Sequence, residues 1–411
     1  MQSVFDKLYE NSLAKREFRN LISIITTEEN IKLAYRNLKK NAGSKTPGTD
    51  GKTIAELAKM SEAELIQVVQ RKFDWYQPQA VRRKEIPKGN GEMRPLGIPT
   101  IMDRLIQQCV LQVMEPICEA KFCETSNGFR PNRGVENALA QAEKHMQKSN
   151  LHIVIDIDVK GFFDNVHHGK LLRQIWAMGI HDKKLLSIIS AMLKAEVAGI
   201  GFPEKGTPQG GIISPLLSNI VLNELDWWIT SQWVDMPTRH EYSGRIHATG
   251  TKDQSKKYRE LRKTKLKECY IVRYADDFKI FCRKHSDAVR LFAAVKAWLK
   301  ERLNLDISPE KSKIVNLKHD YSDFLGFRIR VHKGKKNQYV VISHIAPKAL
   351  QKIKDTAKGK VKAIQHSSDD KAEYAAVNNY NSYVMGIHNY YGMATAANPD
   401  MQTLAYEIKI S

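Results

Sequence analysis

The chain has few cysteines and no long apolar run. Each of these shortages argues against particular classes of protein. Only five of the 411 residues are cysteine, and no two of them form a CxxC pair. Neither a disulfide framework nor a zinc ribbon is therefore indicated. No run approaches the ~18 apolar residues of a membrane-spanning helix. Residues 1–20 carry charges of both signs and lack the apolar centre of a secretory signal, so we expect a cytoplasmic protein.

Acidic residues are in the minority, and the resulting charge is the most informative feature of the composition. The sequence holds 65 lysines and arginines against 45 aspartates and glutamates, a formal net charge of +20. A field of this sign attracts polyanions, most often nucleic acid. The hydrophobic content of 42% is sufficient for packed cores, so wholesale disorder is not expected.

Two segments concentrate the positive charge. Residues 238–267 hold ten lysines and arginines against three acidic residues, and residues 345–365 hold six lysines against one aspartate. Either segment alone is also consistent with a solvated surface that binds nothing. Together, in so basic a chain, they favour contacts with phosphates. The candidate nucleic-acid contacts are Lys256, Lys257, Arg262 and Lys263 in the first segment and Lys352 and Lys360 in the second.

Helical and strand patterns follow each other without a regular βαβ rhythm, which favours an α+β fold. Thr26 and Glu29 have the spacing of a capping box. The apolar residues that follow recur at helical spacing, and they are Ile31, Ala34, Tyr35 and Leu38. Ser214 followed by Pro215 predicts the start of another helix.

Short apolar runs predict strands, with acidic residues at their ends. Residues 151–157 form one such run. Residues 270–273 and 278–282 form a hairpin pattern on either side of the tetrapeptide Tyr274-Ala275-Asp276-Asp277. The acidic strand ends therefore come from segments that are far apart in the chain.

These carboxylates could form a metal site. Asp156 and Asp158 lie two residues apart, so they share one face of their strand. Carboxylates that crowd together raise each other's pKa values, and a divalent cation removes that cost. Ligands that are all oxygen favour Mg²⁺ or Mn²⁺ over zinc. The plainer alternative is that Asp276 and Asp277 are ordinary turn residues.

Basic side chains that could bind substrate phosphates lie in a separate segment. Lys88 and Arg94 flank the tight turn Gly89-Asn90-Gly91, where their side chains could grip a triphosphate. The alternative is an exposed basic hairpin without a ligand. Residues 206–211 form a glycine-rich loop that could let a nucleotide or template approach the backbone, or could be a structural turn. Neither loop has the GxxxxGK[ST] pattern of a P-loop.

Taken in order, these motifs resemble those of the reverse transcriptases encoded by group II introns, the maturase-type proteins. The resemblance spans nearly the whole chain. The YADD box alone is a weak signal, whereas YADD together with DVKGFFDNV, PQGG and FLGF in this order and spacing is specific. The matching blocks are residues 45–51, 84–103, 115–134, 156–166, 206–219, 274–277, 303–313, 324–327 and 381–392.

The resemblance implies a right-hand polymerase followed by a helical domain. Residues 1–150 would form the N-terminal extension and the fingers, with part of the palm. Residues 151–330 would form the palm, with an antiparallel sheet and a basic insertion at residues 232–268. Residues 331–411 would form the α-helical thumb, which in this family is the maturase domain X.

The resemblance also implies the metal ligands. Asp158, Asp276 and Asp277 match the catalytic aspartates and would hold two Mg²⁺ ions. The backbone carbonyl of Val159 would be an accessory ligand. Asp156 is interpreted as a hydrogen-bonding partner on the same face rather than as a ligand.

Four further residues match positions that contact the incoming nucleotide. Phe163 matches the position that excludes a ribose 2′-OH and so selects dNTPs. Gln209 matches the glutamine that lies against the nucleotide. Lys88 and Arg94 match the fingers residues on its triphosphate.

The implied activity is RNA-directed DNA polymerisation, with an RNA template, a DNA primer and dNTPs as partners. In the family the same protein binds its parent intron RNA and assists splicing and mobility. The alternatives are a related non-intron bacterial reverse transcriptase (CRISPR-associated or antiphage), an RNA-binding maturase without polymerase activity, and an RNA-dependent RNA polymerase. The paired cysteines of the nuclease that many relatives carry are absent from these 411 residues, so DNA cleavage is not expected.

Overall fold

A computed structural model describes residues 1–87, 93–242, 244–246, 248, 252–334 and 338–409. The chain forms two compact units, each assembled from separate stretches. Unit 1 contains Met1–Asn132, Val159–Trp228 and Val295–Ser308. Unit 2 contains Arg133–Asp158, Ile229–Ala294 and Pro309–Ser411. Among the described residues, no helix is both long enough and apolar enough to cross a membrane.

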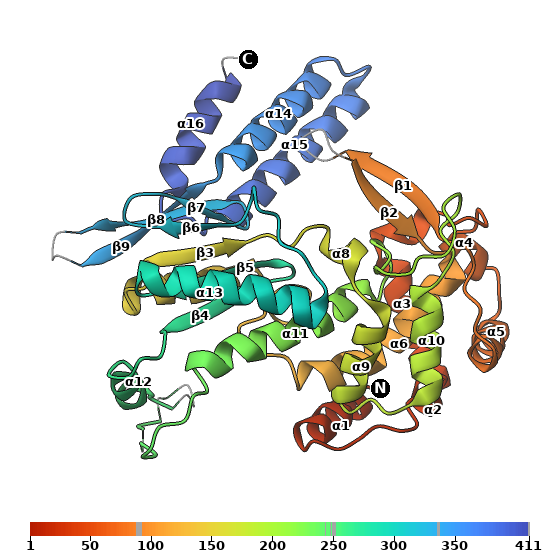
Figure 1. Ribbon diagram of the computed structural model, residues 1–411. Helices are drawn as coiled ribbons and strands as arrows, with labels where there is room; N and C mark the ends of the chain where they lie inside the picture. The colour runs from red at the N-terminus through yellow and green to blue at the C-terminus, as the bar shows by residue number, and fades with distance from the viewer. Residues whose placement is uncertain (88–92, 243, 247, 249–251, 335–337, 410–411) are drawn as a thin grey trace. The chain divides into compact units, whose positions relative to one another are not determined.

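Unit 1 is mostly helical (Figure 1). Helices α1 and α3 pack against α6, which is buried over most of its length. Ser12 donates a hydrogen bond to the Ile117 carbonyl at 2.8 Å, and Asn30 donates one to the Cys109 carbonyl at 3.1 Å. The helices of the unit, in chain order, are α1 (Gln2–Leu13), α2 (Ile22–Ile25), α3 (Glu28–Lys40), η1 (Ala42–Lys45), α4 (Ile54–Leu57), α5 (Glu62–Asp74), α6 (Ile101–Glu119), α8 (Phe162–Asn165), α9 (His168–Ala177), α10 (Lys183–Leu193) and η3 (Leu299–Leu303).

The predicted capping box at the start of α3 is wrong. The N-cap residue is Thr27, which caps with no side-chain hydrogen bond. The Thr26 hydroxyl instead donates to the Ile22 carbonyl at 2.9 Å, so it completes the last turn of α2. The apolar face of α3 is confirmed, because its buried residues include Ile31, Ala34 and Leu38.

Two helices contribute residues to both units, α11 (Ser214–Trp233) and α13 (His285–Trp298). Helix α11 begins at Ser214, as predicted. The Ser214 hydroxyl donates to the Pro208 carbonyl at 2.8 Å, which ties the helix start to the glycine-rich loop before it.

Unit 2 contains a four-stranded antiparallel sheet in the order β4-β5-β3-β6. The hairpin of β4 and β5 is the one predicted from the sequence. All five side chains of β3 are buried, which explains why this central strand reads as an almost continuous apolar run. The strands are β3 (Ile153–Ile157), β4 (Cys269–Tyr274), β5 (Asp277–Cys282) and β6 (Lys313–Asn316).

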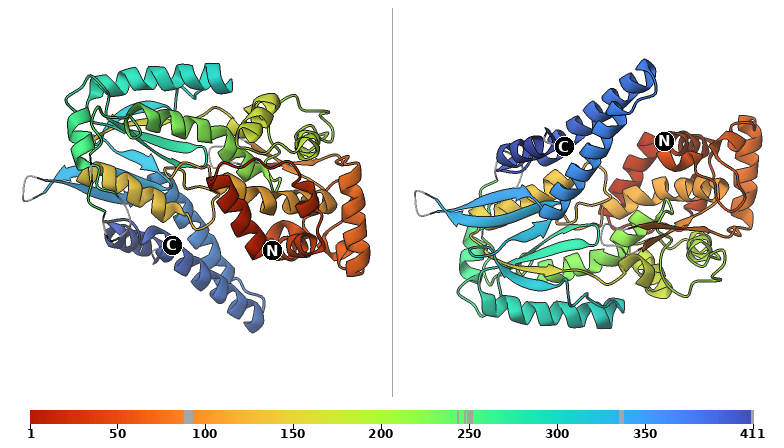
Figure 2. Two further views of the ribbon diagram at one scale, coloured as in Figure 1. Left: turned by 90° about the horizontal axis from the view of Figure 1, so that it is seen from below. Right: turned by 90° about the horizontal axis from the view of Figure 1, so that it is seen from above.

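A second sheet, in the order β7-β8-β9, shares one apolar core with the first. That core includes Ala138 and Leu139 of α7, Phe281 of β5, and Phe324 and Phe327. Helices α14 and α15 follow and lie side by side (Figure 2). The remaining elements are α7 (Val135–Glu143), η2 (Lys144–Lys148), α12 (Ser255–Leu261), β7 (Ser322–Phe324), β8 (Phe327–Lys333), β9 (Tyr339–Ile345), α14 (Pro347–Gln365), α15 (Asp370–Tyr391) and α16 (Ala397–Lys409).

Candidate active site

Two of the sequence-predicted carboxylates, Asp158 and Asp277, become neighbours at one end of the four-stranded sheet. In the pairing of β3 with β5, Asp156 lies opposite Lys279 and Ile157 lies opposite Phe278. Continuing this register by one residue brings Asp158 opposite Asp277. Residues opposite each other on antiparallel strands have Cα atoms ~4.5–5.5 Å apart. Two acids that are far apart in the chain therefore become neighbours in unit 2.

A buried arginine forms a hydrogen bond to the turn that carries Asp276 and Asp277. Ala275 has a φ of 57°, in the left-handed region that side chains rarely adopt. The guanidinium of Arg273 is fully buried, and its Nη1 donates to the Ala275 carbonyl at 2.7 Å. Our sequence reasoning missed Arg273, although a charged residue inside an apolar strand was the available signal.

Asp158 has its own positioning contacts. Its backbone N–H donates to the Ser312 hydroxyl at 3.2 Å. The Lys311 ammonium lies 3.7 Å from Oδ2 of Asp158. The Asp158 side chain is 47% exposed, so it remains open to a ligand.

A buried polar network lies on the same strand face, one step further into the sheet. The Lys279 ammonium is 2.6 Å from Oδ1 of Asp156 and 2.7 Å from the Ser322 hydroxyl. The Ser322 hydroxyl also donates to Asp156, at 2.9 Å from Oδ2. The interpretation of Asp156 as a hydrogen-bonding residue is confirmed, whereas Lys279 and Ser322 were not foreseen.

Burial and, to a lesser extent, neighbouring carboxylates raise the pKa of Asp277. Although the side chain reaches the surface, the protein around it displaces enough water to raise its pKa to about 6. Lys279 opposes this shift, while Asp156, Asp276 and Asp158 add to it. A divalent cation would relieve this repulsion, so an all-oxygen donor set fits Mg²⁺ or Mn²⁺. Nevertheless, no three Asp, Glu, His or Cys side chains in the described ranges already converge as a metal-binding group.

The residues predicted to contact the nucleotide belong to unit 1. Phe163 is half-buried on α8, and its carbonyl accepts a hydrogen bond from the Thr207 N–H at 2.7 Å. The Gln209 carbonyl accepts one from the Gly97 N–H, also at 2.7 Å. The glycine-rich loop is therefore bound both to α8 and to the hairpin of β1 (Arg82–Pro87) and β2 (Met93–Ile98).

Arg94 lies in β2, opposite Ile86. Lys88 lies outside the described residues. The predicted grip on a triphosphate therefore stays a prediction.

Two glycines of this loop occupy places where a side chain would not fit. Gly206 has a φ of +96°, and a Cβ there would lie 3.1 Å from the Asp164 carbonyl oxygen. Gly210 has a φ of +119°, and a Cβ there would lie 2.6 Å from the Gly97 oxygen. The positive φ favours glycine at both positions, and at Gly210 the close approach of the Gly97 backbone adds to this requirement.

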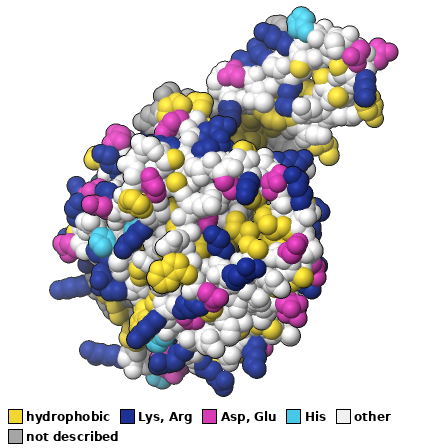
Figure 3. Space-filling model, turned by 90° about the vertical axis from the view of Figure 1, so that its right-hand side faces the viewer, with side chains coloured by type: hydrophobic (Ala, Val, Ile, Leu, Met, Phe, Trp, Pro, Cys, Tyr) yellow, Lys and Arg dark blue, Asp and Glu magenta, His cyan; other side chains and the backbone are white. Residues whose placement is uncertain are grey.

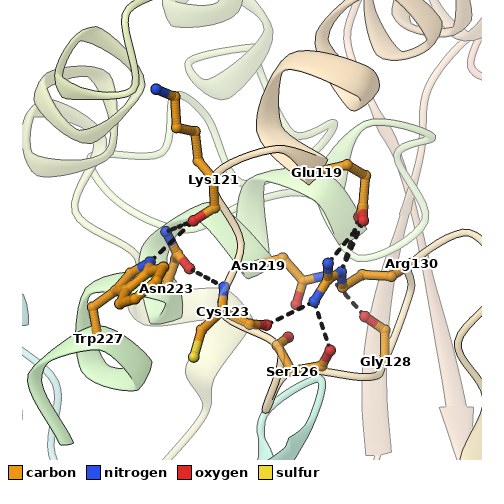
Figure 4. Close-up of polar contacts among 9 residues, drawn as sticks. All are labelled: Glu119, Lys121, Cys123, Ser126, Gly128, Arg130, Asn219, Asn223 and Trp227. Atoms are coloured by element: carbon orange, nitrogen blue, oxygen red, sulfur yellow. Dashed lines mark hydrogen bonds and ion pairs between the residues drawn. The ribbon is translucent and has the colours of Figure 1, made fainter. Parts of the chain in front are cut away.

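The GFRPNRG block has a structural role in unit 1 (Figure 4). The Arg130 guanidinium forms an ion pair with Glu119 at 2.9 Å and donates to the carbonyls of Cys123 and Ser126 at 2.8 and 2.7 Å. Asn219 of α11 donates to the Gly128 carbonyl at 2.8 Å. These bonds fix the loop after α6 against α11.

The candidate nucleic-acid contacts differ in how far they are already engaged. Lys256 and Lys352 are exposed. The others have partners: the Val234 carbonyl for Lys257, Glu268 for Arg262, Glu260 for Lys263, and Asn379 for Lys360. Lys and Arg side chains are also distributed around the face drawn in Figure 3, rather than confined to one patch.

Comparison with known proteins gives a consistent result. The family described as reverse transcriptase (RNA-dependent DNA polymerase) matches residues 86–329. Protein YkfC of Escherichia coli (strain K12) is 33% identical over 343 residues, which cover 80% of this chain and 87% of YkfC. Group II intron-encoded protein LtrA of Lactococcus lactis subsp. cremoris is 30% identical over 469 residues, covering 100% of this chain and 76% of LtrA.

A protein of COX1/OXI3 intron 2 from Saccharomyces cerevisiae is 28% identical over 378 residues, which cover 83% of this chain and 42% of that protein. The similarity to intron proteins thus extends well beyond the polymerase blocks. The chain belongs to the reverse transcriptase family, with the group II intron-encoded proteins, and is an RNA-directed DNA polymerase.

Proposed function

We propose that this polymerase works as a right hand, in which Asp158, Asp276 and Asp277 are the catalytic carboxylates. The observation that carries the proposal is the pairing of β3 with β5, whose register leads to Asp158 and Asp277 as cross-strand neighbours. Residues 1–150 would serve as N-terminal extension and fingers, residues 151–330 as palm and residues 331–411 as thumb. The antiparallel sheet β4-β5-β3-β6 would be the centre of the palm.

Asp158, Asp276 and Asp277 would hold two Mg²⁺ or Mn²⁺ ions, with the Val159 carbonyl as an accessory ligand. When bound, such ions lower the pKa of a primer 3′-OH and neutralise charge on the triphosphate. The contribution of the chain is orientation. The hydrogen bond from Arg273 to the Ala275 carbonyl fixes the turn before Asp276. The Ser312 hydroxyl accepts a hydrogen bond from the Asp158 N–H and so fixes the backbone of Asp158.

Phe163 would select the sugar. A large ring next to C2′ of the nucleotide leaves no room for a hydroxyl group, and this steric argument favours DNA over RNA synthesis. The backbone carbonyl of Phe163 accepts a hydrogen bond from the Thr207 N–H at 2.7 Å, which fixes the point where the ring is attached. Gln209, Lys88 and Arg94 would contact the same nucleotide.

The basic side chains would hold the RNA template and the DNA primer by their backbones. The same surfaces would bind a group II intron RNA and assist its splicing. Support for this comes from the relatives, since LtrA is named as a group II intron-encoded protein. Those relatives also favour the intron-associated role over a CRISPR-associated or antiphage one.

The proposal is tested by dNTP incorporation on an RNA template with a DNA primer, with and without Mg²⁺. Extension should require the metal and should be lost in Asp158→Asn, which keeps the shape of the side chain but removes its charge. Asp74→Asn is the matched control, because that carboxylate is 79% exposed and lies in unit 1. Full extension by Asp158→Asn would overturn the metal assignment. Intact RNA binding without any extension by the unchanged chain would favour a maturase whose polymerase site is idle.

A further inference from the structure

A cavity of about 330 Å³ lies in unit 2 at the end of the four-stranded sheet that is opposite the carboxylates. Strand β3 begins beside it, at Ile153, and runs to Ile157 just before Asp158. At ~3.3 Å per residue, roughly 17 Å of strand separates the cavity from Asp158. Four separate chain segments line it, through Asn150, His152, Arg283, Asn316, Lys318 and Tyr339.

The cationic side chains of this cavity exceed the acids that could neutralise them. The Lys318 ammonium lies 4.6 Å from the centre of the Tyr339 ring, and Lys318 has no ion pair within the part of the chain that the structure describes. Arg283 pairs through Nε with Glu268 and donates through Nη2 to the Ser149 carbonyl at 2.9 Å. Glu268 also pairs with Arg262 at 2.8 Å, so one carboxylate serves two guanidinium groups.

The walls of the cavity are fixed. His152 is only 5% exposed, and its Nε2 lies 3.1 Å from the Met146 carbonyl. Its ring centre is 4.6 Å from that of Tyr339. Burial lowers the pKa of His152, and the charges of Lys318 and Arg283 act in the same direction, as expected of a positive local field. Oδ1 of Asn316 accepts the Lys318 N–H at 3.2 Å, which leaves the amide N–H groups of Asn316 for another partner.

We propose that this cavity is a binding site for a phosphate of the RNA backbone, remote from the polymerase centre. Lysine, arginine and amide donors without a free acid form the donor set that phosphate oxygens require. The chain segments that flank the cavity residues carry further exposed lysines, Lys144 and Lys148 before β3 and Lys284 after β5. The inference rests on the RNA-binding part of the proposed function, and it adds a contact that the polymerase reaction itself does not need.

The test compares Lys318→Gln and Lys318→Arg with the unchanged full-length chain in binding to a long structured RNA over a range of salt concentrations. Lys318→Gln should weaken binding several-fold and reduce the log–log salt slope by about 0.7 to 0.9, the value of one phosphate contact. Lys318→Arg should retain both the affinity and the slope. Lys296→Gln, which removes an exposed lysine of α13, is the charge-matched control and should move the slope less.

A second readout separates this proposal from the polymerase assignment. Primer extension on a template of a few nucleotides should be unchanged in Lys318→Gln, since such a template does not reach the far end of the sheet. Loss of extension in the unchanged chain would count against the polymerase proposal alone. Unaltered RNA affinity and salt slope in Lys318→Gln would overturn the phosphate site. Binding of free ATP or inorganic phosphate that depends on Lys318, without any effect on RNA, would also overturn it in favour of a small-molecule site.

Discussion

Asp156 and Lys279 face each other on neighbouring strands and form an ion pair of 2.6 Å in the interior of unit 2. Their side chains are 12% and 5% exposed, so water screens the pair little. Ser322 bonds to both partners from β7. This ion pair thus stabilises the register of β3 against β5. It lies two residues along each strand from Asp158 and Asp277, which carry the proposed chemistry.

Replacing Lys279 should therefore destabilise the fold. Lys279→Met leaves the Asp156 charge buried without a counter-ion, a change that typically costs ~3–5 kcal/mol. Chemical denaturation measures it. The double variant with Asp156→Asn should recover a large part of the loss, because both charges are then gone. Equal instability of the single and double variants would show that the ion pair is not the cause.

Asp276→Ala should abolish primer extension and leave RNA affinity nearly intact. Loss of charge stabilisation of several kcal/mol corresponds to a rate reduction of about three orders of magnitude or more. The measurement is single-nucleotide incorporation beside RNA binding by the same preparation. Asp323→Ala, at a carboxylate 57% exposed on β7, should extend the primer normally. Residual extension at the control rate would rule out a catalytic role for Asp276.

Phe163→Ala should admit rNTPs. Removing the ring opens space for a 2′-OH, so the preference for dNTPs over rNTPs should fall by about tenfold or more. The measurement is the ratio of kcat/KM for the two nucleotides on one template. Phe163→Tyr keeps the ring and should keep the preference. Unchanged discrimination in the alanine variant would remove the sugar-selection role.

Neutralising Lys256, Lys257, Arg262 and Lys263 together should flatten the salt dependence of RNA binding, because each lost phosphate contact lowers the log–log slope. The pairing of Arg262 with Glu268 calls for a separate control. Arg262→Gln alone, followed by thermal unfolding, reports how much of the effect is structural. A slope that does not move in the fourfold variant would identify this segment as a solvated surface.

Glu115→Gln should stabilise the protein at neutral and alkaline pH. Burial and the neighbouring Glu119 raise the pKa of Glu115 from 4.5 to about 7. The folded state then holds the proton more tightly than the unfolded chain does, so the stabilisation present below about pH 4.5 is lost as the pH rises through 7.

The variant has no proton to lose. The free energy of unfolding of Glu115→Gln should exceed that of the unchanged chain by an amount that grows with pH. This difference should rise from near zero at about pH 4.5 to about 1–3 kcal/mol above about pH 8. Denaturation midpoints at several pH values check this. An advantage that is independent of pH would mean that packing, not ionisation, is responsible.

The sequence by itself determined the features that depend on local spacing. Two apolar runs on either side of a turn tetrapeptide predicted the β4–β5 hairpin, and helical spacing predicted the buried face of α3. The two-residue spacing of Asp156 and Asp158 predicted that they share a strand face. The order of the motifs indicated the family, because each block is a short local pattern. The Thr26 capping box failed since α2, a helix of four residues too short to be seen in the sequence, uses that hydroxyl.

Only the tertiary structure decided which residues become partners across long stretches of chain. It paired Asp156 with Lys279 and Ser322, bound Arg273 under the turn of Asp276, and distinguished the paired Arg262 from the exposed Lys256. It also gathered Arg283, Lys318 and Tyr339 into one cavity. No local pattern encodes such contacts, because hydrogen bonds and ion pairs depend on distances that are fixed only when distant strands align.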